Sequence, residues 1–459
     1  MFTPVFDQSL YDVSRLEPSY WEATATRPTF PRLEGDISVD VAIIGGGYTG
    51  LSTAYHLAKS HGIVAAVLEA GPIAWGASSR NGGFISYPPV KMSIATLKQR
   101  FGEAETRRFF QELRLAADFP KAVATEEGFD IRFQGDGTLD AAHHPRMARH
   151  FADDAAAYAS VGIKATVFSR EAFTEIGHGG TEQFGGMHVE GGGGLHPLLY
   201  AMGLAKAATQ YGARLFAQSP VERWEREGAL HRLVTPGGTV TARRVVIGTN
   251  GWTPDGLNAG LDARVWPALS NIIVTRPLTD AELSAVPWNT ETPVSNTRKL
   301  LFYYRLLPDK RFLFGARGDW TGTPAAALRM RQWMERRLGE VFPPWKGVQV
   351  DYFWRGLVAI SQKLAPSTGR LPDDPSVYYS VNCHGNGVVF APMAGRAIAK
   401  AIGASNSGDV DVPAPLRELP PRFPIPSLRR VALGTAYLGY QIKEWVLDHA
   451  DSLTHRASP

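Results

Sequence analysis

A glycine-rich turn between an apolar run and a helix-compatible segment constrains this chain more than any other feature. Residues 39–44 are mostly apolar and β-branched, which predicts a buried parallel strand. They run into Gly45-Gly46-Gly47-Tyr48-Thr49-Gly50, and residues 49–60 favour a helix. Glycines at 45, 47 and 50 allow a tight turn, close approach of the backbone to a diphosphate, and packing of helix on strand. The pattern predicts a nucleotide-binding βα unit whose helix N-terminus faces the diphosphate.

An acidic residue follows at the spacing that such a unit requires. Residues 64–68 form a second apolar run, which ends at Glu69-Ala70, about twenty residues after Gly50. A carboxylate at this place binds ribose hydroxyls and repels the 2′-phosphate of NADP. The motif alone leaves NAD and FAD open, and a glycine turn also occurs in chains without a nucleotide.

The loop after this unit favours FAD. It is rich in small and turn-forming residues and consists of Gly76, Ala77, Ser78, Ser79, Arg80, Asn81, Gly82 and Gly83. Such a loop lets the backbone come close to an extended ligand, whereas a core segment would carry larger apolar side chains.

With these motifs the chain resembles the D-amino-acid-oxidase-like superfamily of FAD-dependent oxidoreductases, and within it the gamma-glutamylputrescine oxidase group. The resemblance covers nearly the whole chain. Besides residues 40–83 it rests on the segments 195–198, 245–251, 354–356, 366–370 and 383–388, on the proline-rich tail and on the closing helix. It implies FAD contacts near Val221, at Thr249, Asn250 and Gly251, and at Gly385, Asn386, Gly387 and Val388.

The resemblance also implies a reaction. The helix after Gly385-Asn386-Gly387 is expected to point its N-terminus at the flavin pyrimidine ring, where reduction leaves negative charge. Members of the superfamily oxidise a C–N bond by hydride transfer to the flavin. We therefore expect oxidation of a primary or secondary amine to an imine, hydrolysis of the imine, and reduction of oxygen, as the acceptor, to hydrogen peroxide. A dehydrogenase with a quinone or protein acceptor is the alternative.

Three departures refine that expectation. Sarcosine-oxidase-type relatives carry a basic residue for the substrate carboxylate where this chain has Val389, which disfavours an α-amino acid anchored there. Their flavin-tethering cysteine is missing from the segment around Trp354, so FAD is expected to bind non-covalently. Residues 364–365 and Ser367 differ from the gamma-glutamylputrescine group, which leaves the exact amine open.

Two residues are candidates for the substrate pocket. His384 adjoins the flavin turn, although a histidine there also suits backbone capping. Trp354 suits a pocket wall, although a tryptophan at a strand end is more often core. Tyr303 and Tyr304 alternate across a predicted strand, so at most one of them faces the pocket. Cys383 is more readily explained as inert filler than as a reactive thiol.

The length of 459 residues predicts two domains in one α/β chain. We expect a Rossmann-type, glutathione-reductase-like FAD-binding domain with an interleaved mixed-sheet α+β substrate domain. The FAD-binding segments are 38–95, 189–265 and 351–405, and the substrate segments are 96–188 and 266–350. An arm, 1–37, precedes them, and a proline-rich linker with a final helix, 406–459, follows. Further helices are predicted at 104–126, 145–160, 196–211, 325–338, 388–402 and 427–448, and none in 413–426, which holds six prolines.

Charge and cysteine usage exclude other classes of protein. A net charge of +4 over this length is too weak for a nucleic-acid binder. The single cysteine rules out an intrachain disulfide, no Cys/His cluster suggests a metal, and neither a signal sequence nor a membrane span is visible. We expect a cytoplasmic enzyme. A solvated helix face explains Arg429, Arg430 and Lys443 better than contact with a membrane surface does. A flavin-bearing interaction protein without catalytic activity is the least favoured class of protein.

Overall fold

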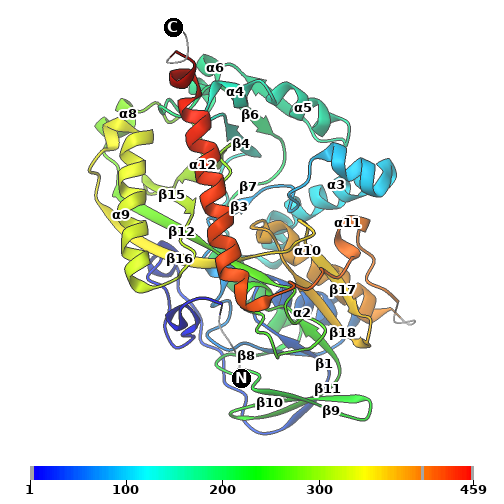
Figure 1. The fold of residues 1–459 in the computed structure, drawn as a ribbon. Coiled ribbons are helices and arrows are strands. Elements are labelled where there is room, and N and C mark those ends of the chain that lie inside the picture. Colours follow the sequence, from blue (N-terminus) through cyan, green and yellow to red (C-terminus); the bar gives the residue numbers. More distant parts are fainter. Residues whose placement is uncertain (1–4, 405–407, 456–459) are drawn as a thin grey trace.

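Two large sheets organise the computed structural model, which describes residues 5–404 and 408–455 (Figure 1). The first sheet has the strand order β17-β18-β11-β1-β2-β8 and is extended by the hairpin of β9 and β10. Its central pairs, β18 with β11, β11 with β1, β1 with β2 and β2 with β8, are parallel. The strands are β1 (Ile37–Ile44), β2 (Ala65–Leu68), β8 (Arg214–Phe216), β9 (Arg223–Glu227), β10 (Leu230–Thr235), β11 (Gly238–Ile247), β17 (Ser367–Leu371) and β18 (Asp374–Val381).

Three helices pack on this sheet and position its turns: α2 (Tyr48–His61), α7 (Pro197–Gln210) and α10 (Gly387–Gly403). The helices α2 and α10 cross closely, because a Cβ atom added at Gly395 would lie only 2.7 Å from the Thr49 carbonyl oxygen. The long helix α3 (Ile94–Glu127) and the arm helix α1 (Tyr20–Thr24) complete this part. The predicted Rossmann-type unit is confirmed, since β1, α2 and β2 follow one another with parallel pairing.

The second sheet is mixed and mainly antiparallel, with the order β16-β12-β15-β14-β13-β4-β6-β5. Only β13 and β4 pair in parallel. Its strands are β4 (Thr138–Ala141), β5 (Ala165–Phe168), β6 (Gly186–Val189), β12 (Trp266–Pro277), β13 (Val294–Asn296), β14 (Phe302–Leu306), β15 (Arg311–Arg317) and β16 (Val350–Ile360). The helices α6 (Arg170–Ile176), α8 (Asp280–Ala285) and α9 (Pro324–Val341) accompany it. A short ribbon of β3 (Phe84–Ile85) and β7 (Gly193–Gly194) lies apart from both sheets.

Three sequence predictions differ from the structure. Strand β16 pairs with β12 from Trp266–Ile360 to Thr275–Val350, so it lies in the second sheet although the predicted boundary at 351 assigned it to the FAD-binding segment. The helix predicted over 145–160 is two helices, α4 (Pro145–Ala148) and α5 (Phe151–Ala159). The proline-rich tail contains a four-residue helix, α11 (Ala414–Arg417), because Pro415 lies in its first turn, where proline is tolerated.

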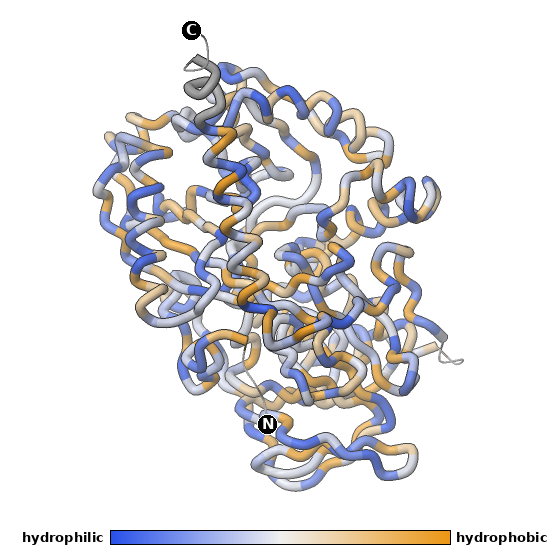
Figure 2. Tube along the Cα trace, in the orientation of Figure 1, coloured by the Kyte–Doolittle hydropathy of each residue, from blue (hydrophilic) through white to orange (hydrophobic). Residues whose placement is uncertain are grey.

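The closing helix α12 (Arg429–His455) runs across the front of the molecule in Figure 1. Arg429 is buried and ion-paired with Asp255, so it is not available for lipid head groups. Apolar and polar segments alternate along α12 (Figure 2), and its exposed side includes Leu438, Ile442 and Trp445. None of the helices in the described part of the chain has the length and apolar character that a membrane span needs.

Candidate active site

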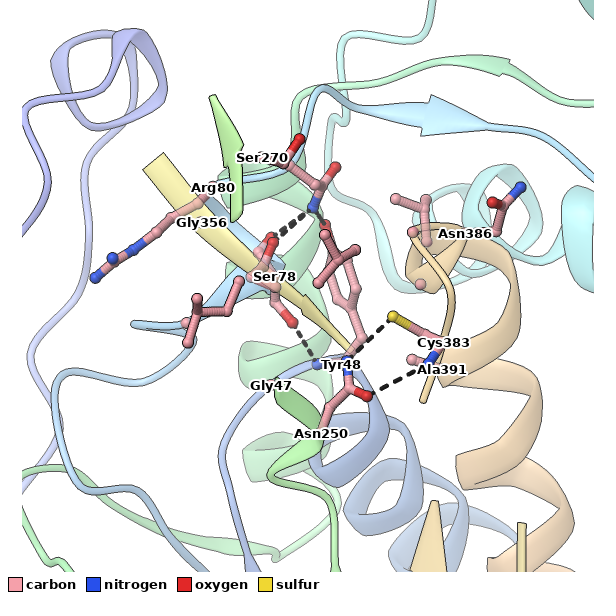
Figure 3. A pocket seen from close by; sticks show the side chains of 18 of the residues that line it. Gly47, Tyr48, Ser78, Arg80, Asn250, Ser270, Gly356, Cys383, Asn386 and Ala391 are labelled. Carbon is pink, nitrogen blue, oxygen red and sulfur yellow. Dashed lines mark hydrogen bonds between the residues drawn. The ribbon is translucent and has the colours of Figure 1, made fainter. Parts of the chain in front are cut away.

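A cavity of about 710 Å³ is lined by turns of the first sheet and by one face of the second. The end of β1, the start of α2 and the loop from 75 to 82 supply one part of the wall. The start of α10, the end of β11 and residues of β12, β14, β15 and β16 supply the rest. Figure 3 shows this meeting of segments that are far apart in the sequence.

The first glycine turn has the geometry that its motif requires. Gly45 has a φ of 104°, and a Cβ atom there would lie 3.0 Å from the Gly248 backbone carbon. A Cβ atom at Gly50 would lie 2.0 Å from the Gly45 carbonyl oxygen, so only glycine lets α2 pack on this turn. Gly47 is the N-cap of α2 and has no side chain with which to cap the helix, and the Ser78 hydroxyl takes one of the first N–H groups, that of Tyr48. Free backbone N–H groups and the helix dipole therefore remain for an anionic ligand.

Glu69 lies beside this turn. Its carboxylate accepts hydrogen bonds from the backbone N–H groups of Gly46, at 2.7 Å, and Gly71, at 3.2 Å. Burial raises the pKa of Glu69, and these two N–H groups oppose the rise. The carboxylate is thereby fixed at the cavity wall, where the sequence predicts a ribose contact.

The loop from 75 to 83 is held in place by its neighbours. Ser78 Oγ accepts a hydrogen bond of 2.9 Å from the Tyr48 N–H, drawn in Figure 3. The arm residue Trp21 donates its indole N–H to the Asn81 carbonyl at 2.9 Å. The Arg80 guanidinium stacks on the Trp75 ring, 4.0 Å from its centre, and points away from Cys383 in Figure 3. Glu17 lies 3.8 Å from the Arg80 guanidinium and offsets part of its charge.

Asn250 joins the end of β11 to the turn that precedes α10. Its Oδ1 accepts from the backbone N–H of Asn382 at 2.8 Å. Its Nδ2 donates to Cys383 Sγ at 3.1 Å, as drawn in Figure 3. Asn250, Asn382 and His384 all have left-handed φ values, of 44°, 64° and 51°. Such conformations are costly for residues other than glycine and persist where the surroundings hold them, here through the Asn250 amide.

The start of α10 is a second helix N-terminus at the same cavity. Its N-cap, Asn386, caps no helix N–H and instead donates its side-chain Nδ2 to the Ser86 carbonyl at 3.2 Å. The cavity therefore has two helix N-termini, one at α2 and one at α10. This arrangement fits FAD, which carries a diphosphate and, separately, a flavin ring that gains negative charge on reduction.

Comparison with known proteins agrees with this geometry. The model of the DAO family, described as FAD dependent oxidoreductase, matches residues 40–401. The chain belongs to this family. It is an FAD-dependent oxidoreductase, and its cofactor is FAD.

Several relatives of this DAO-family chain are characterised. It is 30% identical over 438 residues to gamma-glutamylputrescine oxidoreductase of Escherichia coli (strain K12), covering 91% of this chain and 96% of that protein. It is 26% identical to glycine oxidase of Bacillus subtilis (strain 168), covering 79% and 92%. The crystal structure of glycine oxidase from Geobacillus kaustophilus has the same fold, with a TM-score of 0.67, 22% identity, and coverage of 80% and 94%.

Most residues that the sequence assigns to FAD line the cavity. These are Gly45, Gly47, Tyr48, Thr49, Glu69, Ala70, Gly76, Ala77, Ser78, Arg80, Asn81, Gly82, Val221, Thr249, Asn250, Gly385, Asn386, Gly387 and Val388. Gly50, Gly83 and Gly251 do not, because each supports the wall from behind. A Cβ atom at Gly83 would lie 2.0 Å from the Leu195 carbonyl oxygen, and one at Gly251 would lie 3.3 Å from Leu357 Cβ.

The two candidate pocket residues both lie outside the cavity wall. His384 is buried, and its Nε2 accepts a hydrogen bond of 3.2 Å from the Ser361 N–H. Burial, then the positive charge of Lys91, lowers the pKa of His384 to about 3, so the ring is neutral. Trp354 is fully buried and donates its indole N–H to the Arg80 carbonyl at 2.8 Å. Neither residue lines the cavity, and both hold turns that form its wall.

The second sheet supplies the floor of the cavity. From this floor, the sequence had indicated only that one of Tyr303 and Tyr304 could face the pocket. Ser270 lies opposite Arg317 in the β12–β15 pairing and opposite Gly356 in the β12–β16 pairing. Tyr303 faces the same side, and its hydroxyl lies 2.8 Å from Ser270 Oγ. Tyr304 points into the aromatic core, so the prediction that at most one tyrosine faces the pocket is confirmed.

Three ionisable side chains at the cavity were not expected. Lys91 and Arg317 line it, and neither side chain makes a hydrogen bond or ion pair with any described residue. Burial, then repulsion from Arg317, lowers the pKa of Lys91 to about 8. Asp140 also lines the cavity, and burial, followed by repulsion from Asp154, raises the pKa of Asp140 to about 7. Strand alternation brings Arg317 onto the face of Tyr303, but nothing local to the sequence marks Lys91.

Proposed function

We propose that this enzyme oxidises a primary or secondary amine at the carbon next to nitrogen, giving an imine that water hydrolyses to a carbonyl compound and an amine. The proposal is supported by two relatives that match most of the chain. The E. coli relative is named for gamma-glutamylputrescine and the B. subtilis relative for glycine, and both compounds carry amino groups. A polyamine derivative is the substrate class that the first of these names favours.

Bound FAD would accept a hydride from the substrate carbon and pass both electrons to oxygen, which yields hydrogen peroxide. The residues of the chain position the cofactor and the amine, and they stabilise the charge that develops. The uncapped N-terminus of α10 would offset negative charge at the cofactor end nearest to it. The wall residues listed above exclude water and fix the cofactor and the amine relative to one another.

We assign the Tyr303 hydroxyl to the side of the cavity where the substrate would bind. Burial raises the pKa of Tyr303, so its phenol stays protonated and can donate a hydrogen bond at any physiological pH. Its contact with Ser270 Oγ at 2.8 Å fixes its direction. Neutral donors on the floor suit a substrate whose reactive amine must be uncharged.

Anaerobic bleaching of the bound flavin tests the function. Polyamines, N-methyl amines and amino acids are mixed in turn with the FAD-loaded enzyme, and at least one amine should bleach it. Tyr303→Phe should slow bleaching about fivefold to tenfold, as expected for one lost hydrogen bond. Tyr304→Phe is the matched control, since the Tyr304 hydroxyl is buried without a partner and lies away from the cavity. It should bleach at the wild-type rate.

The outcomes separate the alternatives. Failure of every amine to bleach the flavin would refute amine oxidation and would favour a flavin-bearing protein without turnover. Bleaching followed by slow recovery of the oxidised spectrum in air would replace the oxidase with a dehydrogenase that uses a quinone or protein acceptor. The cytoplasm stays the proposed compartment, on the grounds of the sequence.

A further inference from the structure

One carboxylate faces the cavity from the second sheet and has no partner among the described residues. Of the described residues that line the cavity, two are acidic, Glu69 and Asp140. Backbone N–H groups hold Glu69 near α2, whereas no described residue donates a hydrogen bond to the Asp140 carboxylate or forms an ion pair with it. A carboxylate that is shielded from water and unpaired is costly, so Asp140 is available to a group that enters the cavity.

The strand register places two hydroxyl groups beside Asp140. Thr138 is two residues earlier on β4, so both side chains lie on the same face of the strand. Ser295 of β13 lies directly opposite Asp140 in the β13–β4 pairing. Thr138 and Ser295 both line the cavity, and neither hydroxyl makes a hydrogen bond with a described residue. The three side chains therefore offer a group of neighbouring acceptors to a ligand.

The cationic side chains of the cavity lie away from this group. Arg317 ends β15, which is three strands from β4 in the sheet order, and it packs against the turn before α10 at Gly385. Arg317 lowers the pKa of Lys91, so these two charges act on one another. The pKa of Asp140 is raised by burial and by Asp154, and neither cation acts on it. A cation that binds beside Asp140 would favour its ionised form.

Asp140 also lies at a defined distance from the hydroxyl that we assign to the substrate. Ser295 pairs with Tyr303 on its other side, so Asp140, Ser295 and Tyr303 form one row across three neighbouring strands. Strands in a sheet are about 4.8 Å apart, which puts the backbones of Asp140 and Tyr303 roughly 10 Å from each other. Once a hydrogen bond at each end is allowed for, a chain of about four to six carbons between two nitrogens spans this distance.

We propose that Asp140, together with Ser295 and Thr138, binds a second, positively charged amino group of the substrate. A primary ammonium has three N–H donors, which matches one carboxylate and two hydroxyl acceptors, and its hydrogen bond to a carboxylate is stronger than one between neutral groups. Resting on the proposed function, this narrows the substrate to a diamine or longer polyamine in which one nitrogen is oxidised and another stays an ammonium. Asp140 acts on specificity and takes no part in hydride transfer.

Matched substrates test this inference. Hexylamine, 5-aminopentan-1-ol and 1,5-diaminopentane have the same length and share a primary amine, and their other ends are a methyl group, a hydroxyl and an ammonium. In wild-type enzyme the diamine should have a KM at least about tenfold below those of the other two. Asp140→Asn, which keeps the shape of the side chain, should raise the KM of the diamine roughly tenfold to a hundredfold and leave its kcat and the KM of hexylamine within about twofold. Ser295→Ala should raise the KM of the diamine about twofold to tenfold, because it removes one neutral acceptor.

The control is Asp136→Asn. Asp136 is exposed, precedes β4 and does not line the cavity, so this variant removes the same charge from the same part of the chain. The variant should leave all three KM values unchanged.

A binding arm without turnover uses 2,5-dimethylhexane-2,5-diamine, whose carbons next to nitrogen carry no hydrogen, and the matched monoamine 2,5,5-trimethylhexan-2-amine. Calorimetric titration of the FAD-loaded enzyme should give this diamine a Kd at least about tenfold below that of the monoamine in wild type and in Asp136→Asn. In Asp140→Asn the two Kd values should be equal.

The outcomes distinguish this inference from the proposed function. Equal KM values for the three oxidisable amines, with the blocked diamine binding no more tightly than the monoamine, would overturn the ammonium subsite while amine oxidation stands. Tighter binding of the blocked diamine that depends on Asp140, without oxidation of any amine, would support the subsite and refute the function. If Asp140→Asn instead raised the KM of hexylamine as much as that of the diamine, Asp140 would act on the shape of the cavity and the subsite would be overturned.

Discussion

Replacing Arg305 by methionine perturbs a cation that holds the cavity loop without any acidic partner. The Arg305 side chain is 1% exposed. Its Nη1 donates to the carbonyl oxygens of Gly82, Gly83 and Leu195, at 3.3, 3.1 and 3.0 Å, and its Nη2 donates to Gln134 Oε1 at 2.5 Å. Burial lowers the pKa of Arg305 to about 10, so it remains charged at neutral pH.

The expected loss of stability follows from these contacts. Each hydrogen bond from a charged donor contributes about 1.5–3 kcal/mol, and the cost of burying the cation offsets part of the sum. Methionine fills similar volume but removes a donor from four acceptors, of which the Gly83 carbonyl keeps the Leu195 N–H at 2.8 Å. We expect Arg305→Met to lower the free energy of unfolding by about 3–5 kcal/mol, the range for breaking a buried charged network.

We also expect Arg305→Met to weaken FAD binding, because Arg305 holds the carbonyl of Gly82, which belongs to the cavity wall. Urea unfolding of the apoprotein gives the stability, and FAD fluorescence titration gives the Kd. Arg276→Met is the control: Arg276 pairs with Glu282 outside the cavity, and its loss should cost at most about 1 kcal/mol. An Arg305→Met protein with wild-type urea midpoint and wild-type Kd for FAD would refute the reasoning.

Three further predictions concern pH, core contacts and cofactor attachment. The pKa of Asp140 rises from 3.8 to about 7 on folding, so the stability that its proton confers is present below about pH 4 and is lost as the pH rises to 7. Asp140→Asn should therefore raise the free energy of unfolding of the apoprotein at pH 8 by at most about 4 kcal/mol, seen as a higher melting temperature, and raise it much less at pH 4. An equal shift at both pH values, or the same effect from the exposed control Asp136→Asn, would contradict this. Trp354→Phe should cost about 1–3 kcal/mol of stability through the lost bond to the Arg80 carbonyl and leave KM unchanged; a changed KM in a fully stable variant would restore Trp354 to the substrate pocket. Acid precipitation should leave all FAD in the supernatant, and flavin retained on the pellet would disprove non-covalent binding.

The first glycine turn shows how far local spacing carries. The residues between β1 and β2 are close in sequence, so their pattern determines the turn, the helix and the acidic strand end together. The division between the sheets was harder to predict. Strand β16 was assigned to the wrong sheet because its partner, β12, lies about eighty residues earlier, and pairing across such a separation leaves no local pattern.

His384 shows the same limit within the site. Its place next to Gly385 suggested a pocket residue, yet its left-handed φ of 51° turns the ring towards Ser361. A sequence gives the neighbours of a residue along the chain but not the direction of its side chain. Gly83 was assigned to the FAD loop, but it does not line the cavity. Its carbonyl oxygen instead accepts a hydrogen bond from Arg305, which holds the loop in place.

By itself the sequence determined the nucleotide-binding unit, whose residues are close in the chain, and the cofactor and the family, whose motifs recur along nearly the whole chain. Only the tertiary structure brought Lys91 and Arg317 to one cavity, where no carboxylate of the described residues forms an ion pair with either of them. Charges act through space, and two cations more than two hundred residues apart in the chain share a potential only after the sheets have packed.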